Sequence, residues 1–90
     1  MINGKKIVLT GANSGIGLEV LKLLVKGDNQ ILAVDLYTDK IETFDSNKVT
    51  PMVMDVSKKE NVDSIFDRAI EVLGQIDIFF ANAGYPYYEK

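Results

Sequence analysis

Two residue types that carry much of protein chemistry are missing from this sequence. Cysteine is absent, so the chain can form neither a disulfide framework nor a thiolate zinc site. Histidine is absent as well, which removes the commonest general base and the commonest metal ligand. We therefore expect no metal site in this chain.

Basic clusters and long apolar runs are also scarce. The formal net charge of -3 argues against a surface that binds nucleic acid or an anionic membrane. No apolar run approaches the length of a membrane span, and residues 1–6 lack the apolar segment of a secretory signal. The sequence predicts one small cytoplasmic globular domain without nucleic-acid or membrane partners.

The most informative stretch is residues 10–17, TGANSGIG. Its glycines, Gly11, Gly15 and Gly17, stand between the apolar run 7–9 and a helical pattern, so the backbone can turn sharply and leave its N–H groups uncovered. The start of a helix carries unpaired N–H donors and a partial positive charge, and both attract anions. The stretch therefore predicts a phosphate-binding turn.

Apolar runs and helical stripes alternate along the rest of the chain. Continuous apolar runs predict strands at residues 6–9, 30–35, 49–54 and 76–81. A stripe of apolar side chains predicts a first helix at residues 16–26, followed by Gly27 as its C′ residue; the stripe is Ile16, Val20, Leu23 and Leu24. Residues 36–48 fit either a short helix or a loop.

A second helix is expected between the third and fourth strands. Residues 57–60, SKKE, form a capping-box pattern that predicts its start, and Gly74 predicts its end. The expected core-facing stripe of this helix is Val62, Ile65, Phe66, Ala69 and Leu73.

Strand–helix alternation of this kind predicts an α/β fold: a three-layer Rossmann-type parallel sheet of strand order 3-2-1-4, truncated after the fourth strand. In such sheets ligands bind beyond the carboxyl ends of the strands, at the point where the strand order reverses. The glycine stretch, Asp35, Asp55 and Asn82 all fall at expected strand ends. Their common position predicts a ligand site.

These residues resemble the classical short-chain dehydrogenase/reductase (SDR) family. TGANSGIG is similar to the family fingerprint T-G-x-x-x-G-x-G, and the pair Asp55-Val56 to its D-V pair after the third strand. Asn82-Ala83-Gly84 is similar to the N-A-G motif after the fourth strand. The resemblance identifies residues 1–90 as an NAD(P)-binding Rossmann domain, the N-terminal half of a short-chain dehydrogenase.

The resemblance also implies a role for each matching residue. Amides around Ser14, Gly15, Ile16 and Gly17 would line the cofactor pyrophosphate, and Asp35 would accept hydrogen bonds from the adenosine ribose. Asp55 would take the adenine amino group, the Val56 amide would take a ring nitrogen, and Asn82 would stabilise the end of the fourth strand. The implied cofactor-binding set is Gly11, Asn13, Ser14, Gly15, Ile16, Gly17, Asp35, Leu36, Asp55, Val56, Asn82, Ala83 and Gly84.

The identity of the cofactor can be argued from charge. A carboxylate at Asp35 would repel a 2′-phosphate at close range, and its hydrogen bond needs a free 2′-hydroxyl. Members of the family that use NADP often carry an arginine just before the second glycine or just after the second strand, where this chain has Ser14 and Leu36-Tyr37. We therefore expect NAD as the cofactor.

Each of these roles has a structural alternative. The glycines could form a tight turn that binds nothing, and Asp35 could be a solvated acid at a strand end. Asp55 could be a second, weaker N-cap near Ser57, and Asn82 could serve only to satisfy backbone groups. A P-loop is excluded because no Lys-Ser/Thr pair follows the glycines.

The catalytic residues of the family have no counterpart in this sequence. They are a serine on the fifth strand and a Tyr-x-x-x-Lys motif, but Ile41 stands four places after Tyr37 and Glu89 four places after Tyr85. We expect no catalytic residue and no activity from these 90 residues alone. The expected function is the NAD-binding portion of an oxidoreductase for an alcohol or carbonyl substrate. The alternative is a catalytically inactive, truncated relative that acts as a nucleotide-binding or self-associating interaction module.

The residues of the expected fourth strand also predict how the chain associates with other protein. If the sheet ends at residues 76–81, an edge rich in Ile78, Phe79 and Phe80 is exposed, and exposed apolar edges pair or aggregate. We expect either a homo-oligomer formed through this edge or a longer product that covers it. The expected partners are therefore NAD(H) and a second copy of the chain.

Overall fold

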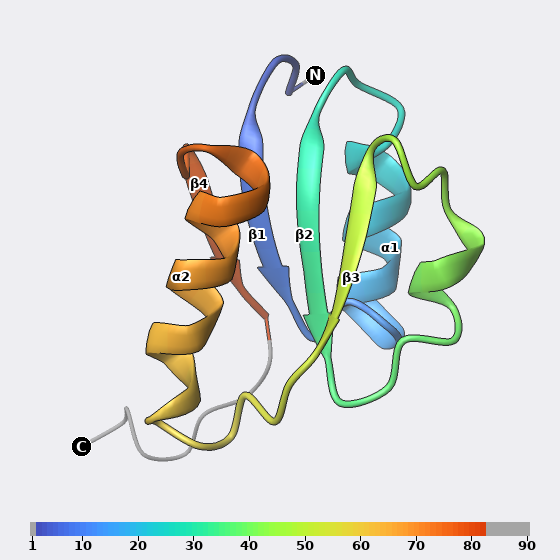
Figure 1. Ribbon diagram of the computed structural model, residues 1–90. Helices are drawn as coiled ribbons and strands as arrows, with labels where there is room; N and C mark the ends of the chain where they lie inside the picture. The colour runs from blue at the N-terminus through green and yellow to red at the C-terminus, as the bar shows by residue number, and fades with distance from the viewer. Residues whose placement is uncertain (1, 83–90) are drawn as a thin grey trace.

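A computed structural model describes residues 2–82 of the chain (Figure 1). The expected motif residues Ala83 and Gly84 and the tail 85–90 lie outside the described residues. The elements follow in the order β1 (Lys6–Thr10), α1 (Gly15–Leu24), β2 (Gln30–Asp35), the 3₁₀ helix η1 (Ile41–Thr43), β3 (Val49–Val53), α2 (Asn61–Leu73) and β4 (Ile78–Ala81).

The four strands form a parallel sheet of order β3-β2-β1-β4, with α1 and α2 on opposite faces (Figure 1). This architecture confirms the expected Rossmann-type fold. Alternate residues of the central strands point to the two faces: Ile7 packs in the core under α1, and Val8 packs in the core under α2. Both strands are buried on both faces, which explains their unbroken apolar runs.

Helix α1 contacts the sheet through a different face from the one that we expected. Its buried residues are Gly17, Leu21 and Leu24, whereas Ile16 is 74% exposed and Leu23 is 58% exposed. Because Gly17 has no side chain, this face of the helix can pack closely against the sheet. The expected stripe was wrong at Ile16 and Leu23, because a pattern of apolar side chains does not identify a glycine as a residue that faces the core.

The ends of both helices also differ from expectation. Val25 caps α1, whereas Gly27 permits a close backbone approach: a Cβ there would lie 2.2 Å from the Ile2 carbonyl oxygen. Helix α2 begins only at Asn61, and no side chain caps it. The expected capping box is therefore wrong.

The C-terminal half of α2 follows the expectation more closely. Gly74 ends the helix in the left-handed conformation, with φ 85°, and Ile65, Ala69 and Leu73 are buried against the sheet. Phe66 is 42% exposed and stacks on Phe79 of β4, with ring centroids 5.1 Å apart. Within residues 2–82, neither helix is long and apolar enough to cross a bilayer.

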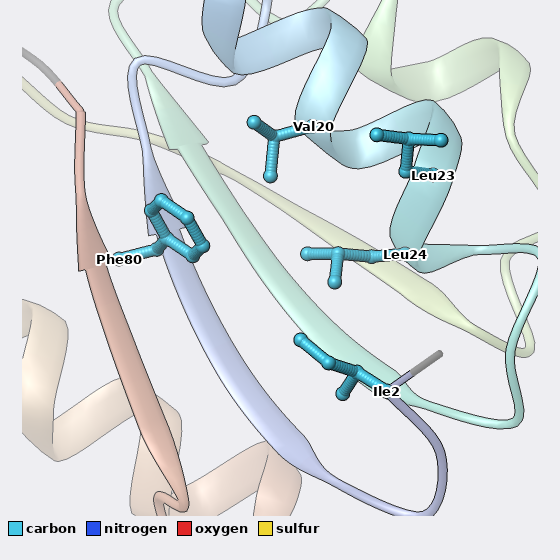
Figure 2. A pocket seen from close by; sticks show the side chains of 5 residues that line it. All are labelled: Ile2, Val20, Leu23, Leu24 and Phe80. Carbon is cyan, nitrogen blue, oxygen red and sulfur yellow. The ribbon is translucent and has the colours of Figure 1, made fainter.

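The sheet has two different edges. Strand β3 forms one edge, and its exposed Pro51 lacks the N–H that a further strand would need. Strand β4 forms the other edge; it begins at Ile78 rather than at residue 76 and contains no proline. An apolar groove of about 340 Å³ lies between β4 and α1 (Figure 2). Its walls are the side chains of Ile2, Val20, Leu23, Leu24 and Phe80.

Helix α1 approaches the sheet most closely at Gly17. A Cβ built on this residue would lie 1.8 Å from the Gly11 carbonyl oxygen and 2.7 Å from Asn82 Nδ2. Neither distance is compatible with a real side chain, and the carbonyl belongs to the backbone at the end of β1, which cannot move freely. The absence of a side chain at Gly17 therefore sets the position of α1 on the sheet.

We predict that Gly17→Ala destabilises the protein by about 3 kcal/mol or more, at the upper end for overpacking, because the helix must move away from the backbone that it contacts. Gly15→Ala is the matched control. Its Cβ would meet no atom of residues 2–82 within 4 Å, so only the strain of its φ of 57° remains, about 1–2 kcal/mol. Urea denaturation followed by circular dichroism measures both; equal losses would contradict the packing role of Gly17.

Candidate functional site

The polar residues singled out from the sequence gather at one edge of the sheet. Strands β1, β2, β3 and β4 are parallel, so their carboxyl ends lie together (Figure 1). The strand order reverses between β1 and β4, which is where ligands bind in open α/β sheets. The glycine turn, Asp35, Asp55 and Asn82 all lie at this edge.

The glycine turn joins β1 to α1. Gly11 has a φ of 67° and Gly15 a φ of 57°, a backbone conformation that other residues rarely adopt. The first bond inside the helix runs from the Leu18 amide to the Ser14 carbonyl oxygen, 3.2 Å away. Amides that precede this bond have no acceptor within the helix. Ser14, Gly15 and Ile16 are exposed, so this end of α1 offers N–H donors and a positive dipole end to an anion.

Asn82 connects the end of β4 to the same turn. Its backbone N–H donates to Thr10 Oγ1 at 3.2 Å, and its side-chain Nδ2 donates to the Gly11 carbonyl oxygen at 3.3 Å. Both acceptors lie at the end of β1 or directly after it. Asn82 therefore holds β4 in place beside the turn and satisfies backbone groups there.

Asp35 ends β2 with both carboxylate oxygens directed at backbone amides. Oδ2 accepts a hydrogen bond from the Asn13 N–H at 2.9 Å, and Oδ1 accepts one from the Leu36 N–H at 2.7 Å. Each oxygen of an ionised carboxylate can accept a further hydrogen bond. The carboxylate is therefore held in place beside the glycine turn and can still bind hydroxyl groups.

Asp55 follows β3 and forms a local turn. Its Oδ1 accepts hydrogen bonds from the Ser57 N–H and from Ser57 Oγ. The pKa of Asp55 is lowered mainly by the Ser57 side chain, then by the Ser57 backbone N–H, against a small opposing effect of desolvation. Because α2 begins only at Asn61, Asp55 is not an N-cap of that helix, and this structural alternative was wrong.

Val56 and Leu36 are two further residues of the expected cofactor-binding set. Val56 is half-buried and packs against the core under α2, whereas Leu36 is 50% exposed. The Met54 N–H donates to the Asp35 carbonyl oxygen at 3.0 Å, which places the ends of β2 and β3 side by side. Asp55 and Val56 therefore begin next to the end of β2.

The side chain of Asn13 makes contacts that the sequence did not indicate. Its Oδ1 accepts hydrogen bonds from the Lys40 and Ile41 amides at 2.8 and 3.1 Å, and its Nδ2 donates to Asp39 Oδ1 at 2.9 Å. Asn13 is buried, with 8% of its surface exposed. Residues 36–48, which fitted a loop or a short helix, form a loop that contains η1 and is bound to the glycine turn.

Asp39 is therefore a residue of this site that sequence reasoning missed. Its position depends on a hydrogen bond across 26 residues, and nothing in residues 36–48 marks one acid above the others. A metal is not indicated: within residues 2–82, no three acidic side chains lie together in a way that could hold a cation.

The sequence matches a family model described as short chain dehydrogenase over residues 5–90. Among curated proteins, it is 30% identical over 90 residues to 3beta-hydroxysteroid dehydrogenase 2 of Eggerthella lenta, a match that covers 93% of this chain and 35% of that protein. It is 35% identical over 89 residues to short chain aldehyde dehydrogenase 1 of Euphorbia lathyris, covering 92% and 31% of the two chains. The chain thus spans about a third of the length of these relatives.

Solved structures show the same relationship. L-sorbose reductase from Gluconobacter frateurii, complexed with NADPH and L-sorbose, superimposes with a TM-score of 0.80 at 30% identity, over 92% of this chain and 34% of that one. The 3-ketoacyl-(acyl-carrier-protein) reductase from Brucella melitensis, complexed with NADH, gives a TM-score of 0.74 at 29% identity, over 86% and 33%.

The family match extends across nearly the whole chain, and the strand order and glycine turn agree with it. The chain belongs to the short-chain dehydrogenase/reductase family of oxidoreductases and spans the N-terminal part of the relatives that it matches.

Proposed function

We propose that these residues bind NAD(H) and form the cofactor-binding portion of an oxidoreductase that acts on an alcohol or carbonyl substrate. One observation carries the proposal: the exposed amino end of α1 and the Asp35 carboxylate lie on the two sides of one turn, joined by the Asn13 N–H. An anion-binding helix end beside a hydroxyl-binding acid suits a phosphate linked to a ribose.

The glycine turn would hold the pyrophosphate. Ser14, Gly15 and Ile16 form an exposed helix end whose amides precede the first bond of the helix. No atom of residues 2–82 lies within 4 Å of the place where a Gly15 side chain would stand. The cofactor backbone can therefore come close to the turn. The residues present fit a dinucleotide in charge and in donor type.

Asp35 would bind the hydroxyl groups of the adenosine ribose, with Leu36 beside it. Its two oxygens are already fixed by the Asn13 and Leu36 amides, so the carboxylate needs little reorganisation when the ribose binds. Asp55 and Val56 follow the neighbouring strand and would contact the adenine. Asn82, directly after β4, would lie beside the cofactor, and the proposed contacts of Ala83 and Gly84 fall outside the described residues.

A bound nicotinamide ring supplies hydride transfer. The residues of this chain supply binding and orientation, and proton transfer would fall to a serine and a Tyr-x-x-x-Lys motif outside these 90 residues. Residues 1–90 would then be the N-terminal part, about a third, of a longer catalytic protein. The alternative of an inactive interaction module is supported within residues 2–82 only by the exposed β4 edge.

We predict that the chain binds NADH more tightly than NADPH and that Asp35→Asn weakens NADH binding about 10- to 100-fold, because hydrogen bonds to a charged group contribute about 1.5–3 kcal/mol. Asp45→Asn is the matched control, because Asp45 is an exposed acid whose carboxylate accepts a bond from Asn47 instead. Titration calorimetry with each dinucleotide measures the affinities.

Binding of neither dinucleotide by the folded chain, checked by circular dichroism, would contradict the proposed function. Tighter binding of NADPH than of NADH would contradict the assignment of Asp35 as a selector for NAD, while leaving dinucleotide binding in place.

The β4 edge would pair with further protein. Ile78 and Phe79 are half-buried and Phe80 is 40% exposed, and the outer backbone groups of an edge strand can accept another strand. When these 90 residues are prepared alone, a second copy of the chain is the available partner. The β3 edge is protected by Pro51.

We expect the isolated chain to elute above its monomer mass of 10.0 kDa in size-exclusion chromatography with light scattering. Phe80→Lys should restore a monomer, since a charge on an edge strand opposes pairing. Val53→Lys on the β3 edge, where Val53 is 63% exposed, is the control and should leave the mass unchanged. A wild-type monomer at about 100 µM would contradict self-association, because micromolar dimers are populated at that concentration.

A further inference from the structure

Asn13 links two acidic side chains that come from different segments of the chain. Its backbone N–H donates to Asp35 Oδ2, and its side-chain Nδ2 donates to Asp39 Oδ1, both at 2.9 Å. Each carboxylate is therefore one hydrogen bond away from the same residue of the glycine turn. The charge near the end of β2 is that of two acids rather than of Asp35 alone.

The segment that carries Asp39 is anchored on both sides. Asn13 Oδ1 accepts bonds from the Lys40 and Ile41 amides, and the Ile41 side chain is 1% exposed in the core under α1. On the other side, Thr38 is buried, and its carbonyl oxygen accepts a bond from the Glu42 amide. Asp39 is thus an exposed acid on a fixed backbone, which keeps its charge close to Asp35.

We propose that Asp39 is a second determinant of the preference for NAD, because its carboxylate, held by Asn13, repels the 2′-phosphate of NADP. This role rests on the proposed function, in which Asp35 binds the adenosine ribose beside the same turn. A 2′-phosphate added to that ribose would be repelled by both acids, whereas the uncharged hydroxyl of NAD can donate a hydrogen bond to Asp35 and is not repelled.

The charges around Asp39 determine how strongly its carboxylate repels the 2′-phosphate of NADP. The hydrogen bond from Asn13 is the main cause that lowers the pKa of Asp39, so the side chain is ionised at neutral pH. The neighbouring Lys40 is a cation that opposes the repulsion. A phosphate monoester carries nearly two negative charges at neutral pH, and charges within a Debye length of about 10 Å interact at 0.1 M salt. We expect Asp39 to weaken NADPH binding about three- to tenfold.

The test is Asp39→Asn, measured as dissociation constants for NADH and NADPH by titration of cofactor fluorescence. The asparagine amide oxygen can still accept the bond from Asn13 Nδ2, so the charge is removed while the anchored loop is kept. NADPH binding should tighten about three- to tenfold while NADH binding stays within about twofold, and the gain should shrink as salt is raised. Asp45→Asn again serves as the control, and neither affinity should change.

A second variant keeps the result clear if Asp39→Asn proves unstable. Lys40→Gln removes the opposing cation without touching the backbone N–H that Asn13 accepts, so it should weaken NADPH binding relative to NADH.

The outcomes distinguish dinucleotide binding by the chain from the role of Asp39 in the choice between NAD and NADP. A folded wild-type chain that binds neither dinucleotide would overturn the proposed function. If the wild type binds NADH but Asp39→Asn changes both affinities equally or neither, Asp39 only positions the loop and its role in selection is overturned.

Discussion

The site depends on one close contact between helix α1 and strand β1. At Gly17 the helix touches the carbonyl group of Gly11 and the amide of Asn82, at distances that leave no room for a methyl group. This contact brings the exposed end of the helix to the carboxyl ends of the strands. Without it, the amides of the glycine turn and the acid at the end of β2 would not lie on one surface.

Three connections then join the strand ends into one unit. Asn82 binds β4 to the turn, the Asn13 N–H binds the turn to Asp35, and the Asn13 side chain binds the turn to the loop after β2. Most of these bonds involve backbone groups. In the proposed dinucleotide site, the acids would therefore be the main side chains that contact the cofactor. Their charge would distinguish NAD from NADP.

The two edges of the sheet differ in how they could accept a further strand. Relatives are about three times as long as the part that matches. The β4 edge borders an apolar groove, and its strand contains no proline. The opposite edge, at β3, carries a proline and ends the sheet. The asymmetry of the two edges indicates on which side further protein would pair.

The sequence by itself determined the fold class, the strand order and the identity of most residues at the strand ends, because continuous apolar runs and the glycine turn are local signals. It misplaced the start of α2 and the buried face of α1, because Asp55 competes for Ser57 and because a glycine leaves no apolar signal where the helix packs most closely. The side-chain contacts of Asn13 and the place of Asp39 beside the turn were decided only by tertiary structure. Their hydrogen bond spans 26 residues, and no local pattern specifies which acid of a polar loop will reach the turn.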